Sequence, residues 1–353
     1  MQKKNTWDLG RLYAAAALFA TLLGTTGCYK DLLPDEQDHL SNNMNYTTEN
    51  FVAVLGKTNV FINVFNADYS TQPLTFTLEN IRSGDKQPAP ILRQQIDTRQ
   101  WKTWYSGFEK TIDEIMSKTF VTKRPILDIR ENSGEIIFWN VDSNTVAYGK
   151  YFFDVRVKNK AGERVFSNLT LDVRRPHPYE PYTIDDITGI QKPLASGGLV
   201  KAHDARNVRD YMQRLLPKDS IDVFFVKTGT AKNTVSVRFF NPDSTVIPLT
   251  VFDMQRWDSL YYYSPQAATR VKFGFNQRFD TDSTIVTWDI PSPFPVLTDV
   301  SGGLDMAQVG FDFKRVNFGR QEAGYVMVRF AIQEPGEWTV AVKFRQKPKF
   351  EDD

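Results

Sequence analysis

Residues 148–174 read YGKYFFDVRVKNKAGERVFSNLTLDVR and contain two runs in which apolar and polar residues alternate. A period of two places one face of a β-strand in a core and the other face in solvent. The intervening residues 159–163, Asn-Lys-Ala-Gly-Glu, supply a glycine where a tight turn needs a positive φ. The segment therefore predicts a β-hairpin with one buried face. The apolar residues of that face are Phe153, Val155 and Val157 in the first run and Leu169, Leu171 and Val173 in the second.

Residues 148–162 resemble the last hairpin of bacterial immunoglobulin-like domains. The shared features are a G-x-Y strand opening at Gly149, alternating valines and an N-x-x-G turn at Asn159. This resemblance implies an immunoglobulin-like β-sandwich. It implies a fold only, because such sandwiches carry many unrelated functions.

Runs with strand character continue on both sides of the hairpin and predict a chain that is mostly β. The aromatic share of 13% agrees, since aromatic residues favour strands and large cores. The runs are 60–65, 74–78, 126–129 and 134–141 before the hairpin, and 221–227, 234–240, 246–252, 270–275, 284–290, 308–314, 325–333 and 337–345 after it.

A proline-rich segment divides this pattern. Residues 174–183, RRPHPYEPYT, hold three prolines and end the alternation. Proline restricts the backbone of its neighbours to extended conformations, which suits a short stiff connection. We therefore expect an immunoglobulin-like sandwich at 51–174, a linker at 175–183, and a second sandwich or jelly roll at 184–353.

Two short helices are expected within the β pattern. Residues 111–118, TIDEIMSK, carry acidic residues early and a lysine late, as the helix dipole favours. In residues 204–216, four apolar residues fall at helical spacing behind Asp204, and aspartate is a common N-cap.

The N-terminus has the three-part layout of an export signal. Basic residues flank an apolar run at 14–23, and Gly-Thr-Thr-Gly leads into Cys28, the only cysteine. The run is too short to cross a bilayer, which takes about 20 apolar residues. A lone cysteine at this point predicts lipid attachment, with residues 1–27 removed as a signal peptide. The other interpretations are an ordinary exported protein with a free thiol and a cytosolic protein with a buried helix.

The sequence around Cys28 resembles lipoprotein signals of Bacteroidota. Thr25 stands where most lipoprotein signals carry leucine or another aliphatic residue, and a looser pattern is typical of that phylum. Residues 29–36 contain Tyr-Lys-Asp and further acidic residues, similar to its surface-export signals. The resemblance implies an outer-membrane protein exposed at the cell surface. Residues 28–50 are polar and are expected to form a flexible tether.

Charge and motifs exclude several classes of function. The net charge of +1 becomes about −1 without residues 1–27, which carry three basic residues and one acidic residue. Such a chain lacks the basic surface that nucleic acid or anionic lipid requires, so the lipid is expected to be the membrane anchor. His39, His177 and His203 lie apart in the sequence, and no zinc, nucleotide or G-x-S-x-G motif occurs. We therefore expect no catalytic residue, metal or cofactor.

Two clusters of aromatic residues are the candidate ligand site. Sugar rings have apolar faces that stack on Trp and Tyr, so exposed rings beside polar groups favour a carbohydrate platform. The competing interpretation is that these rings are core, as is usual for large aromatic side chains. The candidates are Trp101, Trp104 and Tyr105 in the first half and Trp257, Tyr261 and Tyr262 in the second.

Turns with an Asp-Ser-Thr sequence recur at 243–245 and 282–284, with a looser copy at 142–145. Aspartate and serine side chains bond the backbone two residues on, which accounts for such turns. Calcium binding is the alternative, although no copy supplies the six to eight oxygen ligands that the ion takes.

The complete layout is a lipid-bearing cysteine, a tether and two β modules. It resembles the SusE/SusF-like accessory lipoproteins that accompany SusC/SusD transporters in glycan-uptake systems. The resemblance implies a surface protein that holds a glycan or an envelope partner without transforming it. The alternatives are a structural module that contacts other outer-membrane proteins and a glycosidase-like enzyme, which needs only two opposed carboxylates.

Overall fold

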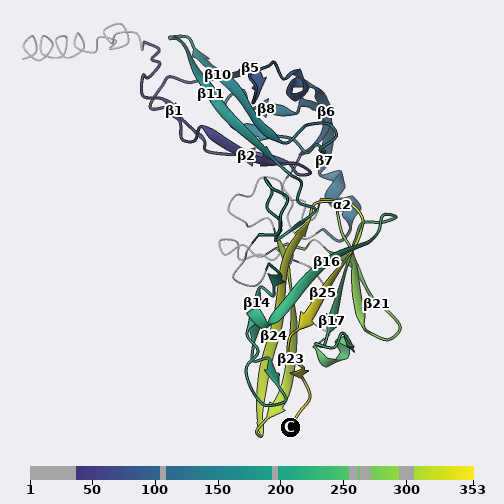
Figure 1. The fold of residues 1–353 in the computed structure, drawn as a ribbon. Coiled ribbons are helices and arrows are strands. Elements are labelled where there is room, and N and C mark those ends of the chain that lie inside the picture. Colours follow the sequence, from purple (N-terminus) through teal and green to yellow (C-terminus); the bar gives the residue numbers. More distant parts are fainter. Residues whose placement is uncertain are drawn as a thin grey trace, which may run out of the picture.

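A computed structural model gives the fold of the chain (Figure 1). It describes residues 37–103, 109–192, 198–253, 261–262, 271–272, 274–293 and 306–353. The strands form two bodies that lie end to end, with helix α2 at their junction (Figure 1). No helix among the described residues is long and apolar enough to cross a membrane.

The first body is a sandwich of a four-stranded sheet, in the order β2-β11-β10-β5, and a three-stranded sheet, in the order β3-β9-β8. Both sheets contribute to one core, which includes Phe51, Phe153 and Phe138. The strands are β1 (Asn45–Tyr46), β2 (Asn50–Val54), β3 (Asn59–Phe61), β4 (Phe65–Asn66), β5 (Thr75–Ser83), β8 (Leu127–Ile129), β9 (Ile136–Phe138), β10 (Gly149–Asn159) and β11 (Gly162–Arg174), with a 3-10 turn η2 (Pro90–Arg93).

The predicted hairpin is present as β10 and β11, which pair antiparallel across the turn from Asn159 to Gly162. All six apolar residues of its predicted inner face are buried. Asp154, which the alternation places on the outer face, is also buried, because the strand register shifts at this residue. Its carboxylate accepts hydrogen bonds from Arg82 Nη2 at 2.9 Å and from the Asn168 amide at 2.9 Å, which compensates for the burial.

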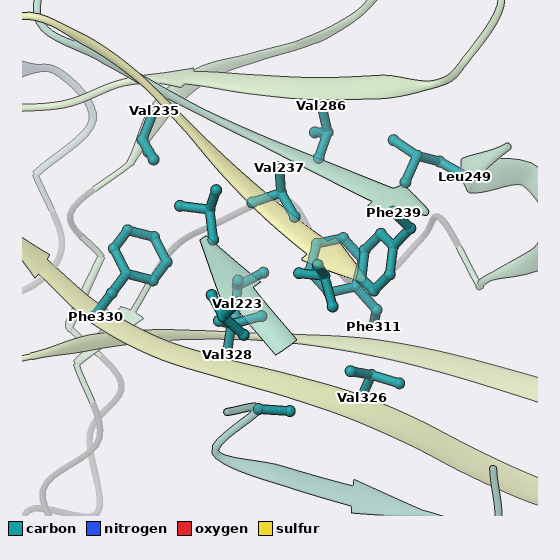
Figure 2. Close-up of a cluster of buried hydrophobic side chains, with 14 of the residues drawn as sticks. Val223, Val235, Val237, Phe239, Leu249, Val286, Phe311, Val326, Val328 and Phe330 are labelled. Carbon is teal, nitrogen blue, oxygen red and sulfur yellow. The ribbon is translucent and has the colours of Figure 1, made fainter. Parts of the chain in front are cut away.

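The second body packs a six-stranded sheet, containing β12-β24-β23-β19-β20 and β14, against a seven-stranded sheet, containing β13-β16-β25-β17-β22-β21 and β18. Phe239 and Phe311 meet between the two sheets with their ring centroids 4.7 Å apart, and Phe330 lies elsewhere in the same core (Figure 2). The elements are β12 (Tyr179–Glu180), β13 (Val200–Lys201), β14 (Asp204–Arg206), β15 (Arg209–Asp210), η3 (Lys218–Ser220), β16 (Ile221–Gly229), β17 (Thr234–Phe240), β18 (Val246–Ile247), η4 (Leu249–Val251), β19 (Tyr261–Tyr262), β20 (Val271–Lys272), β21 (Phe275–Phe279), β22 (Ile285–Asp289), β23 (Ala307–Asn317), β24 (Arg320–Ile332), β25 (Glu337–Phe344) and β26 (Pro348–Lys349).

These two sandwiches confirm the predicted fold class, a mostly β chain built from tandem β-sandwiches. The runs predicted at 325–333 and 337–345 form β24 and β25, and alternating burial is regular along the whole of β25. In β25, Trp338, Val340, Val342 and Phe344 are all buried while the residues between them are partly exposed. A strand that is buried on one face only has this pattern.

A hairpin arm connects the first body to the core of the second. It consists of β6 (Gln95–Trp101), α2 (Ile112–Ser117) and β7 (Thr119–Pro125). The predicted helix forms here, and the Thr111 side chain caps it by accepting from the Glu114 amide at 3.1 Å. Ile115 is only 1% exposed and belongs to the second core, and Trp101 and Ile112 pack against the same core. The second core thus includes a residue from the range 51–174 that the sequence assigned to the first sandwich.

The predicted helix at 204–216 is wrong. The segment forms β14 and β15 instead, with Asn207 at positive φ in the turn between them and Gln213 at positive φ in the turn after β15. Asp204 does not cap a helix, because its carboxylate accepts a hydrogen bond at 2.6 Å from the Tyr325 hydroxyl on the neighbouring strand. Pairing with a distant strand outweighs the local helical spacing.

Two segments expected to be extended coil are partly folded. Met44 and Tyr46 of the predicted tether 28–50 are buried in the first core, so the folded body begins before residue 51. Within the predicted linker 175–183, Tyr179 and Glu180 pair with β24 as an edge strand. His177 is also buried there, and its Nδ1 lies 2.6 Å from Glu180 Oε1. Few apolar residues suffice to anchor a polar segment when each has a pocket to fill.

A candidate ligand-binding groove at the junction of the two bodies

Two adjoining hollows lie where the arm meets the second body. Their volumes are about 230 Å³ and about 600 Å³. They adjoin because Met116 of α2 and Ser292 line both. We call them together the junction groove. Trp101, Trp139, Arg99 and Asn140 line the first hollow, and Lys232, Arg278 and Asp289 line the second.

Two tryptophans give the first hollow its apolar surface. Trp101 ends strand β6, where it pairs with Thr119 of β7, and its side chain is half-buried. Trp139 follows β9 and is buried, with its ring nitrogen donating to Asp128 Oδ2 at 3.1 Å. Arg124 Nε donates to the same carboxylate oxygen at 2.8 Å. These bonds hold the Trp139 ring in one orientation, because a buried indole N–H needs an acceptor.

Polar side chains beside the tryptophans are held by the arm itself. Arg99 Nη1 donates to Thr119 Oγ1 at 2.8 Å, and that hydroxyl donates to the Met116 carbonyl at 2.7 Å. The Thr98 hydroxyl donates to the Thr122 carbonyl at 3.1 Å. These bonds join β6, α2 and β7, so the groove wall is ordered before any ligand arrives.

Of the aromatic residues predicted to bind a ligand, Trp101 is the one that the described part of the chain places in the groove. Cys28, Trp104, Tyr105 and Trp257 lie outside the described residues. Tyr261 and Tyr262 form strand β19, which pairs with β20 and β23. The carbohydrate-platform prediction therefore depends on Trp101.

Three further lining residues, Trp139, Arg99 and Lys232, were not predicted from the sequence as site residues. Trp139 lies within a run that predicts a core strand, and it is indeed mostly buried. Arg99 follows the alternation of β6, two residues before Trp101, which is the one local signal that associates them. Lys232 lies between β16 and β17, far away in the sequence.

The Asp-Ser-Thr turns are accounted for by their own hydrogen bonds. Asp243 Oδ1 accepts from the Thr245 amide at 3.0 Å and from its hydroxyl at 2.6 Å, and these bonds lower the pKa of Asp243. In the copy at 282–284 the acceptor is Asp280, two residues before the triplet, which accepts from the Thr284 amide at 2.6 Å and from its hydroxyl at 2.5 Å. Among the described residues, no group of three or more His, Cys, Asp or Glu is arranged to hold a metal ion.

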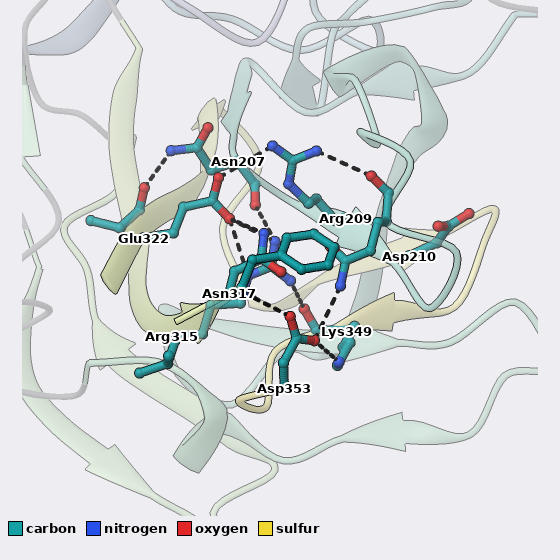
Figure 3. Close-up of polar contacts among 12 residues, drawn as sticks. Asn207, Arg209, Asp210, Arg315, Asn317, Glu322, Lys349 and Asp353 are labelled. Atoms are coloured by element: carbon teal, nitrogen blue, oxygen red, sulfur yellow. Dashed lines mark hydrogen bonds and ion pairs between the residues drawn. The ribbon is translucent and has the colours of Figure 1, made fainter. Parts of the chain in front are cut away.

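A polar cluster at the far end of the second body has a structural role (Figure 3). Arg315 is 2% exposed and donates to the Lys349 carbonyl at 2.6 Å and to Glu322 Oε2 at 2.9 Å. Burial opposes the charge of Glu322, but the hydrogen bonds from Arg315 and Arg209 outweigh it and lower its pKa. The cluster attaches the C-terminal strand β26 to β23 and β24.

Comparison with known proteins identifies a family without identifying an activity. No curated protein matches the chain. The first domain of VCBP3 from Branchiostoma floridae is 13% identical, covers 37% of this chain and 93% of its own, and superposes with a TM-score of 0.19. The two tandem V-type regions of VCBP3, a v-region-containing chitin-binding protein, are 10% identical, with coverages of 84% and 98% and a TM-score of 0.20.

A third solved structure, immunoglobulin domains 1–4 of Sidekick-1, is 12% identical and covers 85% of this chain and 50% of its own, with a TM-score of 0.19. The family model of a domain of unknown function, DUF5007, matches residues 65–352 and so covers the first sandwich from β4 onward, the arm and the second sandwich. The chain belongs to the DUF5007 family.

Proposed function

We propose that this protein is a non-catalytic, lipid-anchored binding protein that holds a glycan in the junction groove. The observation that carries the proposal is the half-buried Trp101 in a hollow of about 230 Å³ beside ordered polar side chains. A concave site with an aromatic wall and a few convergent polar groups suits small-molecule binding. A sugar presents an apolar ring face to tryptophan and hydroxyl groups to the polar side chains.

The place of action in this proposal is the outer membrane of a member of the Bacteroidota. Its support is the signal-like N-terminus that ends at Cys28, together with the acidic residues behind it. The resemblance in layout to SusE/SusF-like lipoproteins suggests a SusC/SusD-like transporter as the partner. A Cys28→Ser variant should no longer incorporate labelled palmitate and should leave the membrane fraction; membrane retention without label would contradict lipid anchoring.

Affinity gel electrophoresis over a panel of polysaccharides tests glycan binding. Migration of the mature chain should be retarded by at least one polysaccharide, and Trp101→Ala should abolish the retardation. Because Trp101 also packs against the second core, Asn140→Ala provides a second groove variant whose side chain is exposed. Tyr69→Ala, at a tyrosine that is 98% exposed and outside the groove, is the matched control and should bind normally.

The same panel separates the alternatives. Retardation that survives both groove variants would place the glycan elsewhere on the molecule. Release of shorter sugars during incubation would favour the glycosidase-like enzyme. No retardation by any polysaccharide, with a folded protein, would refute glycan binding and favour the structural module.

A further inference from the structure

The charges of the junction groove are not balanced. Arg99 and Lys232 are exposed cations in its lining, one in each hollow. Among the described residues no carboxylate forms an ion pair with either of them, and the Arg99 guanidinium is bonded only to the Thr119 hydroxyl. Both cations are therefore available to a ligand.

The carboxylates of the groove, in contrast, have cationic partners. Asp97 Oδ1 lies 3.0 Å from Lys123 Nζ. Asp289 Oδ1 lies 2.8 Å from Arg278 Nη1, and its other oxygen accepts from Asn276 at 2.9 Å. Within the described residues that line the groove, the charge left unpaired is thus positive, although the complete chain is almost neutral.

Arg99 is also well placed relative to the aromatic surface. Arg99 and Trp101 are two residues apart on β6, so their side chains lie on the same face of the strand. The Thr119 hydroxyl orients the guanidinium there. A sugar ring stacked on Trp101 brings its substituents within reach of Arg99, and guanidinium binds planar anions such as carboxylate through two parallel hydrogen bonds.

We infer that the ligand of the junction groove is an acidic glycan, whose carboxylate or sulfate groups pair with Arg99 and Lys232. This inference rests on the proposed glycan binding and specifies the class of glycan. Pairing with an exposed cation weakens as salt screens the charges. Affinity for an acidic polymer should therefore fall between low and moderate ionic strength.

The test uses the mature chain in affinity gels that contain polygalacturonate (carboxylate), chondroitin sulfate (carboxylate and sulfate), dextran sulfate (sulfate) or neutral dextran and xylan, at 20 and 300 mM NaCl. Arg99→Gln should weaken binding to an acidic polymer roughly tenfold, as expected for loss of a hydrogen bond to a charged group. Lys232→Gln should weaken it less, because lysine acts as a point charge. Arg99→Lys should retain part of the affinity. Lys160→Gln removes the same charge from an exposed turn outside the groove and is the control.

The outcomes distinguish the inferred acidic ligand from the proposed glycan binding on which it rests. Retardation by acidic polymers that falls with salt and with Arg99→Gln, but not with Lys160→Gln, supports the inference, and the carboxylate and sulfate polymers identify the anion. Retardation by neutral polymers alone, sensitive to Trp101→Ala, overturns the acidic ligand and leaves glycan binding standing. If Arg99→Gln and Lys160→Gln weaken binding to acidic polymers equally, the attraction is nonspecific, and the inference of an acidic ligand in the groove is also overturned. No retardation by any polymer refutes both.

Discussion

Replacing Ile115 by alanine should destabilise the second sandwich, although this residue lies in the part of the chain that builds the first. Ile115 is 1% exposed, and its buried neighbours belong to the core between β17, β25 and the sheet that faces them. The substitution leaves α2 its capping threonine and replaces isoleucine with a better helix former. Lost packing against the second core is therefore its main effect.

The size of the effect follows from the groups removed, a methyl and an ethyl group. Their transfer to water costs about 0.8 kcal/mol per carbon, or about 2.4 kcal/mol for the side chain. The cavity left behind adds to this, and such substitutions in cores cost about 2–5 kcal/mol. We expect the free energy of unfolding of the second sandwich to fall by about 3 kcal/mol, which is roughly a hundredfold in the unfolding equilibrium.

Native-state hydrogen exchange with mass spectrometry measures the change in the free energy of unfolding for each sandwich separately. Peptides from β17 and β25 report on the second sandwich, and peptides from β10 and β11 report on the first. Ile115→Ala should speed exchange in β17 and β25 roughly a hundredfold, with a much smaller change in β10 and β11. Ile126→Ala is the matched control, because Ile126 is 0% exposed in the first core.

The control should give the reverse pattern, with faster exchange in β10 and β11. If Ile115→Ala accelerated hydrogen exchange only in the first sandwich, the arm would not dock in the second core and the reasoning would fail. Equal acceleration of both sandwiches by both variants would mean that they unfold as one cooperative unit, which also contradicts two separately stabilised cores.

Three further predictions concern charged groups and a turn. Burial opposes the charge of Asp222, but hydrogen bonds from Arg345, with Nε at 3.0 Å, and from Lys201 outweigh it and lower its pKa. This stabilisation is present above the unfolded-state pKa of about 3.9 and is lost as pH falls through the pKa of the folded state. In urea titrations at a series of pH values, Asp222→Asn should therefore lose less stability below about pH 4 than the unsubstituted protein does. An equal loss in both proteins below about pH 4 would contradict this. Arg315→Met should lower the free energy of unfolding by about 1.5–3 kcal/mol in urea denaturation, because it removes hydrogen bonds to the Lys349 carbonyl and to Glu322, which keeps Arg209 as its remaining cationic partner. A loss below about 1 kcal/mol would count against that role. Phe318 is 78% exposed with φ 49°, so Phe318→Asn should stabilise the turn by about 1 kcal/mol and raise the melting temperature, whereas a lower melting temperature would refute strain there.

The parts of the fold that the sequence predicted follow local rules. The β10–β11 hairpin has a strict alternation and a glycine at its turn, and both features act over a few residues. The helix at α2 likewise carries its own start signal, since Thr111 caps it from within the segment. Such elements are predictable because their neighbours in sequence are also their neighbours in space.

The errors occur where distant segments decide the structure. Spacing alone favoured a helix behind Asp204, but the segment gains more by pairing with β24, where Tyr325 binds the Asp204 carboxylate. Polar composition likewise predicted a tether through residue 50, but Met44 and Tyr46 each fill a place in the first core. Neither the pairing with β24 nor the packing in the first core can be predicted from the residues that are adjacent in sequence.

The candidate site was predictable only in part for the same reason. Trp101 was predicted because it belongs to a cluster of aromatic residues in the sequence. Arg99, Trp139 and Lys232 join it because strands from both bodies converge at the junction, and no motif spacing encodes that convergence. The acidic ligand that we infer could not be predicted from the almost neutral composition, since the inference depends on which cations of the groove lack a carboxylate partner among the described residues.

Adjacent residues of α2 connect the groove to the stability of the second sandwich. Ile115 lies in the second core, and Met116 lines both hollows. The groove is therefore complete only while the arm is docked, and a ligand that binds there stabilises the docked arrangement by mass action. At a ligand concentration one hundred times Kd the gain is about 2.7 kcal/mol, close to the loss expected for Ile115→Ala. At that concentration a glycan bound in the groove should slow exchange in β17 and β25 about as strongly as the substitution speeds it.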